Sequence, residues 1–282
     1  MFRQSPGVTE AAFNSKGVQT MQLVDISAET ERAFFTCLHL EEPEDWESTA
    51  HSREWYARYK DKGYRAQVLI LDDGRIVGKC HYIPIEHSPF IGKDLLAILC
   101  LCVHMYEYRV GDQRGRGYGR FMLDHIEQYA RSLGFRGVVA WAMDWHWNPV
   151  SFYEHMGYSR VDAEDKVVVV WKPFAGDAEP PSLLRLDTVP GTCDDKVHVV
   201  VADNPWCDGN QRLMTAREAI KGIEHLVEYT EAKPPCRDRM IHLGYVGGIF
   251  LDGRPHRPYE LIGDASDLRA EIIRLYEHKQ QP

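Results

Sequence analysis

The chain has 282 residues, an apolar fraction of 44% and a formal net charge of −9. This length exceeds that of one typical domain and predicts two, and the apolar fraction is that of an ordinary globular protein. The acidic balance argues against nucleic-acid binding as the main activity, and it suits a cationic amine as substrate.

No membrane span and no leader are expected. The longest apolar run, 95–103, is the length of a strand and far short of the roughly 20 residues that span a bilayer. Residues 1–22 lack a charged stretch followed by an apolar one, so no signal peptide is visible. Seven cysteines at irregular spacing are typical of reduced thiols, which predicts a cytoplasmic protein.

The first domain is predicted over 19–174, after a tail over 1–18. Ser27 is a good N-cap for a first helix, and the turn Asp72-Asp73-Gly74 joins two strands into a hairpin. A near-continuous apolar segment predicts a buried central strand over 95–104. The other expected elements are a helix over 52–61 and strands over 19–25, 66–71, 76–85, 137–143, 159–164 and 166–171.

A linker is predicted over 175–195, because Pro, Asp and Gly are frequent there. Beyond it a second domain is predicted over 196–282, with Trp206 and Cys207 in the turn that follows its first strand. The expected elements of this domain are a strand over 196–202, a helix over 215–229, strands over 246–251 and 258–262, and a last helix over 267–277.

The most informative segment is Arg114-Gly115-Arg116-Gly117-Tyr118-Gly119, which a helix-patterned run follows at once. Alternating glycines leave backbone N–H groups uncovered, and such a turn on a helix N-terminus predicts a phosphate or pyrophosphate site. The segment is not a P-loop, which needs Lys followed by Ser or Thr, and its glycines are too close together for a dinucleotide fingerprint. A plain glycine-rich connection is the alternative.

A second segment is Asn148-Pro149-Val150-Ser151-Phe152-Tyr153-Glu154-His155-Met156-Gly157-Tyr158. Asn148 and Pro149 can cap and open a short helix that Gly157 ends. Together with R-x-x-G-x-G in the earlier segment, it resembles the two signatures of the GNAT acetyltransferases. The resemblance implies an α+β fold, an α/β sandwich with a mixed, mostly antiparallel sheet flanked by helices.

The same resemblance implies acyl transfer from acetyl-CoA to an amine, with the backbone amides of 114–119 on the pyrophosphate. It implies that the N–H of Cys102 or Val103 stabilises the oxyanion and that Tyr153 protonates the sulfur of CoA. The alternative for Tyr153 is a core aromatic residue. Asn148 either contacts the cofactor or only caps its helix.

The general base is left open by the sequence. His104 and Glu107 follow the central strand, and Asp144 and His146 follow the next one. A histidine pKa near 6.5 suits base catalysis. Nearby tryptophans form either an aromatic wall for the substrate or part of the core, and these are Trp141, Trp145 and Trp147.

The second domain, with its Trp-Cys turn, helix, hairpin and last helix, resembles a thioredoxin-like fold. The two halves together resemble the YoaP-like acetyltransferases. Asn210 stands where a second redox cysteine belongs, and Tyr245-Val246-Gly247 lacks the usual proline, so two-thiol exchange is not expected. Cys100 and Cys102 share one face of a strand but lack further ligands, so no metal site is predicted.

Three functions follow from these patterns. The first is an N-acetyltransferase acting on a small-molecule amine or a protein amine, by direct attack in a ternary complex. The second is a non-catalytic acyl-CoA sensor. The third is a protein that handles thiols or metals through Cys207. A homodimer is compatible with each of them.

Overall fold

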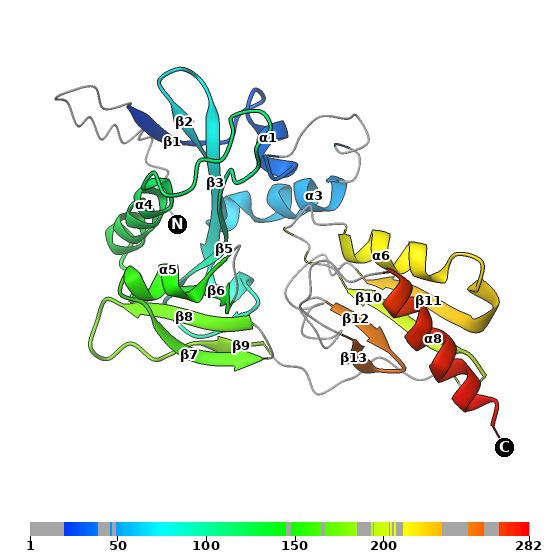
Figure 1. Cartoon of the computed structure of the whole chain (residues 1–282). Coiled ribbons are helices and arrows are strands. Elements are labelled where there is room, and N and C mark those ends of the chain that lie inside the picture. The colour runs from blue at the N-terminus through cyan, green and yellow to red at the C-terminus, as the bar shows by residue number, and fades with distance from the viewer. Residues whose placement is uncertain are drawn as a thin grey trace.

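The computed structural model describes residues 20–38, 46, 49–144, 148–164, 167–184, 193, 195–202, 204, 206, 211–232, 248–256 and 265–281. Two units lie side by side, and each has its own sheet (Figure 1). Within the described residues, no helix is both long enough and apolar enough to cross a membrane.

The first unit is built on a seven-stranded sheet in the order β1-β2-β3-β5-β6-β8-β7. All neighbours are antiparallel except β5 and β6, so the sheet is mixed and mostly antiparallel, as predicted. The strands are β1 (Met21–Asp25), β2 (Arg65–Leu71), β3 (Ile76–Pro84), β5 (Leu96–Val103), β6 (Gly137–Met143), β7 (Ser159–Glu164) and β8 (Val167–Pro173).

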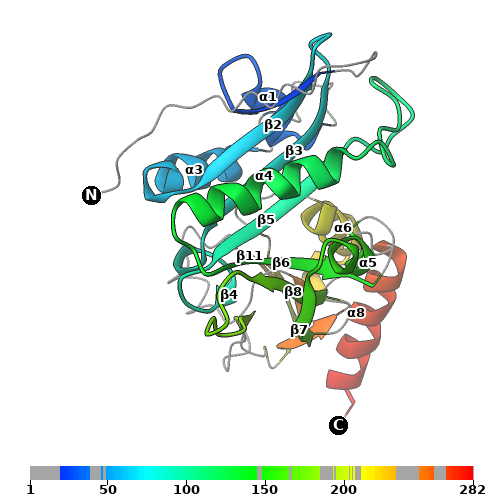
Figure 2. The ribbon, with the colours of Figure 1, turned by 90° about the vertical axis from the view of Figure 1, so that its left-hand side faces the viewer.

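Helices cover both faces of this sheet, because its strands carry apolar side chains on both sides. On one face α4 (Tyr118–Ser132) packs across β3 and β5 (Figure 2), and α5 (Val150–His155) lies beside β6 and β8. On the other face lie α1 (Glu31–Phe35) and α3 (Ala50–Tyr59), which a 3₁₀ turn over Lys60–Lys62 prolongs.

The two parallel strands part soon after they begin to pair. β5 and β6 are paired only as far as Ile98 and Ala140. Immediately after Ile98, a bulge leaves Leu99 without a partner on β3, where Tyr82 faces Ile98 and His81 faces Cys100. A bulge bends its strand and increases the local twist, so β5 leaves β6 at this residue. Among the described residues, no strand pairs with the rest of β5 on the side of β6.

The first helix begins later than the sequence predicts. Residues 28–30 form a turn in which the carbonyl oxygen of Ser27 accepts from the amides of Thr30 and Glu31, and α1 begins only at Glu31. The Ser27 hydroxyl accepts from the Glu29 amide at 3.3 Å. Ser27 thus closes a turn instead of capping the helix, because its short side chain bonds its own neighbouring backbone.

One strand of a short two-stranded sheet lies within the range that the sequence predicts to be a linker. β9 (Ser182–Leu183) pairs antiparallel with β4 (Phe90–Ile91), which follows a 3₁₀ turn over Ile85–His87. Leu183 and Leu184 are buried in the core of the first unit. The chain therefore returns to this unit after β8, and two-residue strands give too little alternation to be seen in the sequence.

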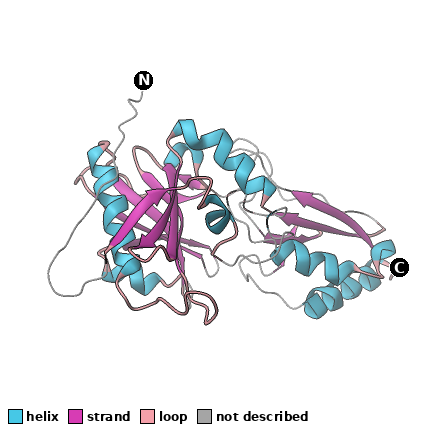
Figure 3. Ribbon diagram, turned by 90° about the horizontal axis from the view of Figure 1, so that it is seen from above, coloured by secondary structure: helices cyan, strands magenta, loops and turns pink. Residues whose placement is uncertain are grey.

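The second unit has a four-stranded sheet in the order β11-β10-β12-β13. β10 and β11 are parallel and the other neighbours are antiparallel. Two helices, α6 (Gln211–Ile220) and α8 (Ala265–Lys279), contact each other and the sheet (Figure 3). The strands are β10 (Val197–Ala202), β11 (Val227–Ala232), β12 (Gly248–Leu251) and β13 (Arg254–His256).

The helix predicted over 215–229 is wrong in its second half. α6 ends at Ile220, Gly222 adopts a positive φ of +80°, and Val227 begins β11 after a 3₁₀ turn over Glu224–Leu226. Glycine ends helices in this way because it has no Cβ to oppose the left-handed conformation. The strand predicted over 258–262 lies outside the described residues, and β13 precedes it.

One side chain of the second part of the chain is packed into the core of the first. Trp206 is 5% exposed and meets Trp55 of α3 at a ring-centroid distance of 5.6 Å and an interplanar angle of 64°. Edge-to-face contact is a favoured geometry for aromatic pairs. Trp206 is therefore held against α3.

Candidate active site

The glycine turn leads into α4 as the sequence predicts. Gly115 and Gly117 have φ of +74° and +84°, values that residues with a Cβ rarely adopt. Gly117 is the N-cap of α4, and a Cβ at either glycine would find open space within 4 Å. Among the described residues, no acceptor takes the amides of 115–119. The turn thus exposes N–H groups on a helix N-terminus, which is the geometry of an anion site.

Arg114 is bound to its neighbour Asp112. Its guanidinium donates from Nε at 3.0 and 3.1 Å and from a terminal nitrogen at 2.7 Å, and its backbone amide donates at 2.9 Å. These bonds lower the pKa of the Asp112 carboxyl to about 2. In this conformation Asp112 occupies the Arg114 amide, so binding of a phosphate by this amide stays a prediction that requires this bond to break.

The open edge of β5 presents Val103 and not Cys102. The His104 amide donates to the Val77 carbonyl of β3 at 2.9 Å, and successive residues of a strand direct their amides to opposite sides. The Val103 amide therefore points into the gap towards β6. The Cys102 carbonyl points at β3, where it lies 3.1 Å from the position of a Cβ on Gly78. Of the two predicted oxyanion donors, only Val103 faces the gap.

Two side chains occupy the start of this gap. The indole Nε1 of Trp141, on β6, donates to the Leu99 carbonyl of β5 at 2.7 Å. The side-chain amide of Asn148 donates to the backbone carbonyl of Trp141 at 2.8 Å. The backbone carbonyl of Asn148 accepts from the Met143 amide, also at 2.8 Å. Asn148 does not cap α5, whose N-cap is Pro149. The capping prediction is wrong because Asn148 instead bonds the free edge of β6.

Tyr153 is buried in the core between α5 and the sheet. It is 1% exposed and packs against Phe152 and Tyr158 at centroid distances of 5.2 and 5.4 Å. Burial is the main cause that raises the pKa of its hydroxyl, with Cys100 and Cys80 adding to the effect. The phenol therefore keeps its proton at neutral pH.

His104 is the base candidate with the best-defined geometry. Its ring is 2% exposed, and Nδ1 lies 3.0 Å from the Gly111 carbonyl. A carbonyl only accepts, so Nδ1 carries the proton and Nε2 of the neutral ring keeps its lone pair. Nε2 is buried and has no hydrogen-bond partner. In the neutral tautomer with the proton on Nδ1, Nε2 is an acceptor, which is the role that general-base catalysis requires.

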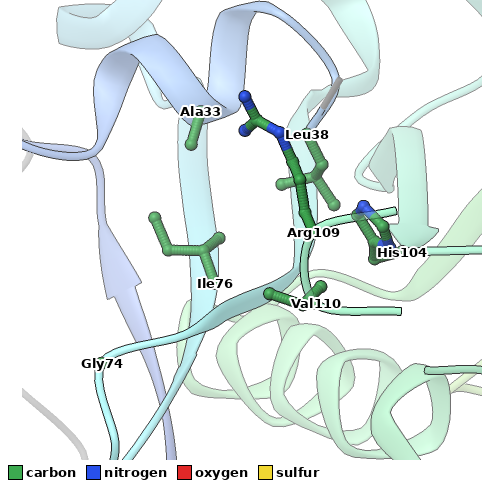
Figure 4. Close-up of a pocket in the computed structure, with 7 residues that line it drawn as sticks. All are labelled: Ala33, Leu38, Gly74, Ile76, His104, Arg109 and Val110. Carbon is green, nitrogen blue, oxygen red and sulfur yellow. The ribbon is translucent and has the colours of Figure 1, made fainter. Parts of the chain in front are cut away.

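A pocket of about 500 Å³ lies beside His104, at the start of β3 and the end of β5, on the face of α1 (Figure 4). Figure 4 shows Arg109 extending towards α1, with His104 on the same side of the view as Arg109 and with Ala33 and Ile76 opposite. The residues that line the pocket are Ala33, Leu38, Gly74, Ile76, His104, Arg109 and Val110. Among the described residues that line it, most side chains are apolar, and the polar ones are a guanidinium and an imidazole.

The other candidates from the sequence have different surroundings. Glu107 is exposed in the segment after β5 and does not line the pocket. Asp144 forms an ion pair with Arg160 at 3.0 Å, which disfavours it as a base. His146, Trp145 and Trp147 lie outside the described residues.

The cysteines within the described residues are thiols and not disulfides. Cys100 and Cys102 do share the face of α1, because they oppose His81 and Lys79 of β3. The described residues contain no group of three or more His, Cys, Asp and Glu side chains that could hold a metal ion. Cys207 and Asn210, which carry the thiol hypothesis, lie outside the described residues.

Sequence reasoning missed two contributors to the site. Arg109 stands in the pocket, and Asp112 binds the first residue of the glycine turn. Both residues lie in the long segment between the central strand and the glycine turn. The length of this segment and its charged residues could have indicated them, because a tight connection would contain neither. The bond from Trp141 to β5 had no signal, because it depends on how far the two strands part.

An enzyme that takes an acyl group from CoA must hold a diphosphate and a thioester at once. The glycine turn provides anion-binding amides and the edge of β5 provides unpaired backbone beside them. The protein is an acyltransferase. Residues 29–158 match the model of the acetyltransferase (GNAT) family, and they form a GNAT acetyltransferase domain, whose acyl donor is acetyl-CoA.

No curated protein matches the chain. Among solved structures it is similar to an acetyltransferase from Thermus thermophilus, with 20% identity, 55% of this chain and 97% of that chain covered, and a TM-score of 0.40. PaiA N-acetyltransferase from Thermoplasma acidophilum, solved in complex with coenzyme A, has 16% identity, coverage of 55% and 99%, and a TM-score of 0.39. A GNAT-family acetyltransferase from Staphylococcus aureus has 12% identity, coverage of 55% and 100%, and a TM-score of 0.40.

Proposed function

We propose that this protein transfers the acetyl group of acetyl-CoA to a primary amine by direct attack within a ternary complex. The observation that carries the proposal is the parting of β5 from β6 after Ile98, next to the exposed amides of the glycine turn. One site for a diphosphate and one open strand edge lie together. A strand edge with unpaired N–H and C=O groups binds an extended amide chain.

The cofactor would be held in two places. Its pyrophosphate would accept from the amides of 115–119, with the positive end of α4 behind them. Its pantetheine amides would pair with Leu101 and Val103, whose backbone groups face the gap. The Arg114 guanidinium would bind phosphate only if it shared its donors with Asp112 or left that residue. The phosphate and the Asp112 carboxylate would therefore compete for this guanidinium.

The transfer needs one base and one oxyanion donor. The amine nitrogen attacks the thioester carbonyl carbon, a C–N bond forms, and the Val103 amide stabilises the oxyanion. The intermediate then collapses and the C–S bond breaks. The proton of the nitrogen passes to Nε2 of His104, and the thiolate leaves with the bonding electron pair. Glu107 would assist only through water, because it is exposed outside the pocket.

Tyr153 would donate its proton, through a hydrogen bond, to the leaving sulfur. In water this transfer is unfavourable, because a phenol pKa near 10 exceeds a thiol pKa near 8.5, and burial raises the pKa of Tyr153 further. Burial also raises the pKa of a thiol beside Tyr153, so the difference between the two pKa values becomes smaller. After CoA leaves, the phenolate takes up one proton and His104 releases one, which restores both groups.

A separate proposal concerns the fold of the second unit. We infer a thioredoxin-like fold for it, and two features support this: a helix joins two parallel strands, and an antiparallel hairpin and a last helix follow. The thiols of the described cysteines support a cytoplasmic location. Trp206, beside Cys207 in the sequence, is buried against α3.

The test is CoA release from acetyl-CoA with a panel of amines, comparing the wild type with His104→Asn. Asparagine keeps a donor for the Gly111 carbonyl at the position of Nδ1 and removes Nε2. We expect kcat to fall about 10²–10⁴-fold, which is the usual contribution of a general base. Acetyl-CoA affinity should not change.

Two results would contradict the proposal. Acetyl-CoA binding without CoA release for any amine would favour a sensor. An unchanged kcat in His104→Asn would remove the assigned base. Tyr153→Phe should lower kcat without changing acetyl-CoA affinity, and an unchanged kcat would make Tyr153 a core residue only.

A further inference from the structure

Two basic side chains meet beside the glycine turn, where α4 begins and α5 ends. A terminal nitrogen of the Arg120 guanidinium lies 3.0 Å from Nε2 of His155, and both residues are exposed. A guanidinium only donates, so Nε2 of His155 accepts this bond and carries no proton. The imidazole thereby holds the guanidinium in place.

Close packing of α5 against the start of α4 brings these two residues together. Gly119 is the second residue of α4, and a Cβ on it would lie 3.3 Å from the ring of Phe152. Gly119 is also the last residue of the glycine turn, so Arg120 directly follows the amides that are proposed to bind the pyrophosphate. Arg120 and His155 therefore lie at the phosphate end of the cofactor site.

The Arg120 guanidinium has no acidic partner within the described part of the chain, and its described bond is the one to His155. Glu154, the neighbour of His155, is bound instead by Arg160 at 2.8 Å. Asp124, one helical turn after Arg120, forms no described ion pair with it. Because a guanidinium has five N–H donors, Arg120 keeps most of them for an anion, in a chain whose net charge is −9.

The acyl donor offers an anion of the right kind next to the glycine turn. CoA carries a phosphate monoester on the 3′ oxygen of its ribose, one sugar away from the pyrophosphate. Such a group has about two negative charges at neutral pH, and its hydrogen bonds to a guanidinium are charge-assisted.

We propose that Arg120, positioned by His155, binds the 3′-phosphate of CoA and makes the protein select CoA over 3′-dephospho-CoA. This inference rests on the proposed function, because it takes the pyrophosphate to lie on the glycine turn. Arg120 touches the cofactor, whereas His155 acts through Arg120 and is a positioning residue.

CoA and 3′-dephospho-CoA form a matched pair of ligands for the test, because they differ only in this phosphate. The overall negative charge of the chain repels the more highly charged CoA, so tighter binding of CoA reports a local basic site. By calorimetry at low salt, we expect Kd for CoA to be at least about tenfold lower, in line with charge-assisted hydrogen bonds. Equal affinities in the wild type would overturn the inference and leave the proposed function intact.

Arg120→Gln should abolish the preference by weakening the binding of CoA, with little change for 3′-dephospho-CoA. Arg58→Gln is the control, because it removes an exposed arginine of α3, on the opposite face of the sheet, that has no partner among the described residues. The control should keep the preference. A preference that persists in Arg120→Gln would overturn the assignment to this arginine.

His155 is tested by two variants that differ in whether they can accept a hydrogen bond. His155→Leu removes the acceptor and should reduce the preference for CoA, whereas His155→Gln supplies an oxygen acceptor and should restore it. The ratio of the two affinities is insensitive to a general loss of stability, so it reports the position of the guanidinium. A wild-type ratio in His155→Leu would overturn the positioning role.

Kinetics separate this inference from the proposed function. The 3′-phosphate is remote from the reacting thioester, so acetyl-3′-dephospho-CoA should show a KM about tenfold above that of acetyl-CoA, with kcat unchanged. Equal KM values for the two donors would count against the inference alone. Absence of CoA release for every amine, with the binding preference present, would overturn the proposed function alone.

Discussion

Replacement of Gly117 by aspartate tests the phosphate site most directly. Gly117 is the N-cap of α4 with φ +84°, and a Cβ there meets nothing within 4 Å. Asparagine is the matched variant, because it has the same shape without the charge. Both residues tolerate a positive φ better than most, so their backbone cost is shared and cancels in the comparison.

The magnitude follows from the distance between the new carboxylate and a diphosphate on the turn. Two unit charges about 5 Å apart interact by about 0.8 kcal/mol in bulk water and by more near a protein surface. Against a doubly charged diphosphate, the aspartate should cost about 1–3 kcal/mol relative to asparagine, which is about 5–150-fold in Kd. An acidic residue at a helix N-terminus is favourable, so α4 should be no less stable with aspartate than with asparagine.

Calorimetric titration with acetyl-CoA measures the difference, with thermal unfolding as the control for folding. The Asp-to-Asn difference should shrink as salt is added, because the turn is exposed and its charges are screened. Equal affinities for the two variants, at low salt and with both folded, would refute the placement of the pyrophosphate. An equal loss in both would indicate a backbone effect and no electrostatic one.

Two further predictions concern stability. Trp206→Ala should lower the free energy of unfolding by about 3 kcal/mol, measured by urea denaturation, because it empties a buried site against Trp55. The double variant with Trp55→Ala should lose less than the sum of the single losses, and strict additivity would argue against the contact. Burial, with Lys79 nearby, lowers the pKa of His81 well below 6.5, so below that pH the unfolded chain binds a proton that the native state excludes. Stability should therefore fall as pH is lowered from 7 to 5 with a slope of up to about 1.4 kcal/mol per pH unit, and His81→Leu should lack this part of the slope.

The sequence was sufficient for the parts of the fold that depend on local patterns. The hairpin around Gly74 formed where alternation and turn residues predict it. The glycine turn and α4 followed from glycine conformations and helical spacing, both of which are local properties. The strand β5 was visible because its side chains are apolar on both faces.

The rest depended on distant parts of the chain. β9 is two residues long, and only its pairing with β4 defines it. Asn148 bonds the edge of β6 and does not cap the helix that follows it, and this choice depends on a strand edge that the local sequence does not reveal. The choice between Cys102 and Val103 needed the bond from His104 to Val77, because an amide direction cannot be read from residue type.

The bulge at Leu99 has a consequence for how this domain could lose its activity. Pairing with β6 stops at the residue before the bulge, so the opening exists because β5 contains one surplus residue. A shortening of the strand by that residue would favour further pairing with β6, in competition with Asn148, which already bonds this edge, and such pairing would exclude the thioester. A fully paired sheet would have no activity, so stability and activity would oppose each other in this domain.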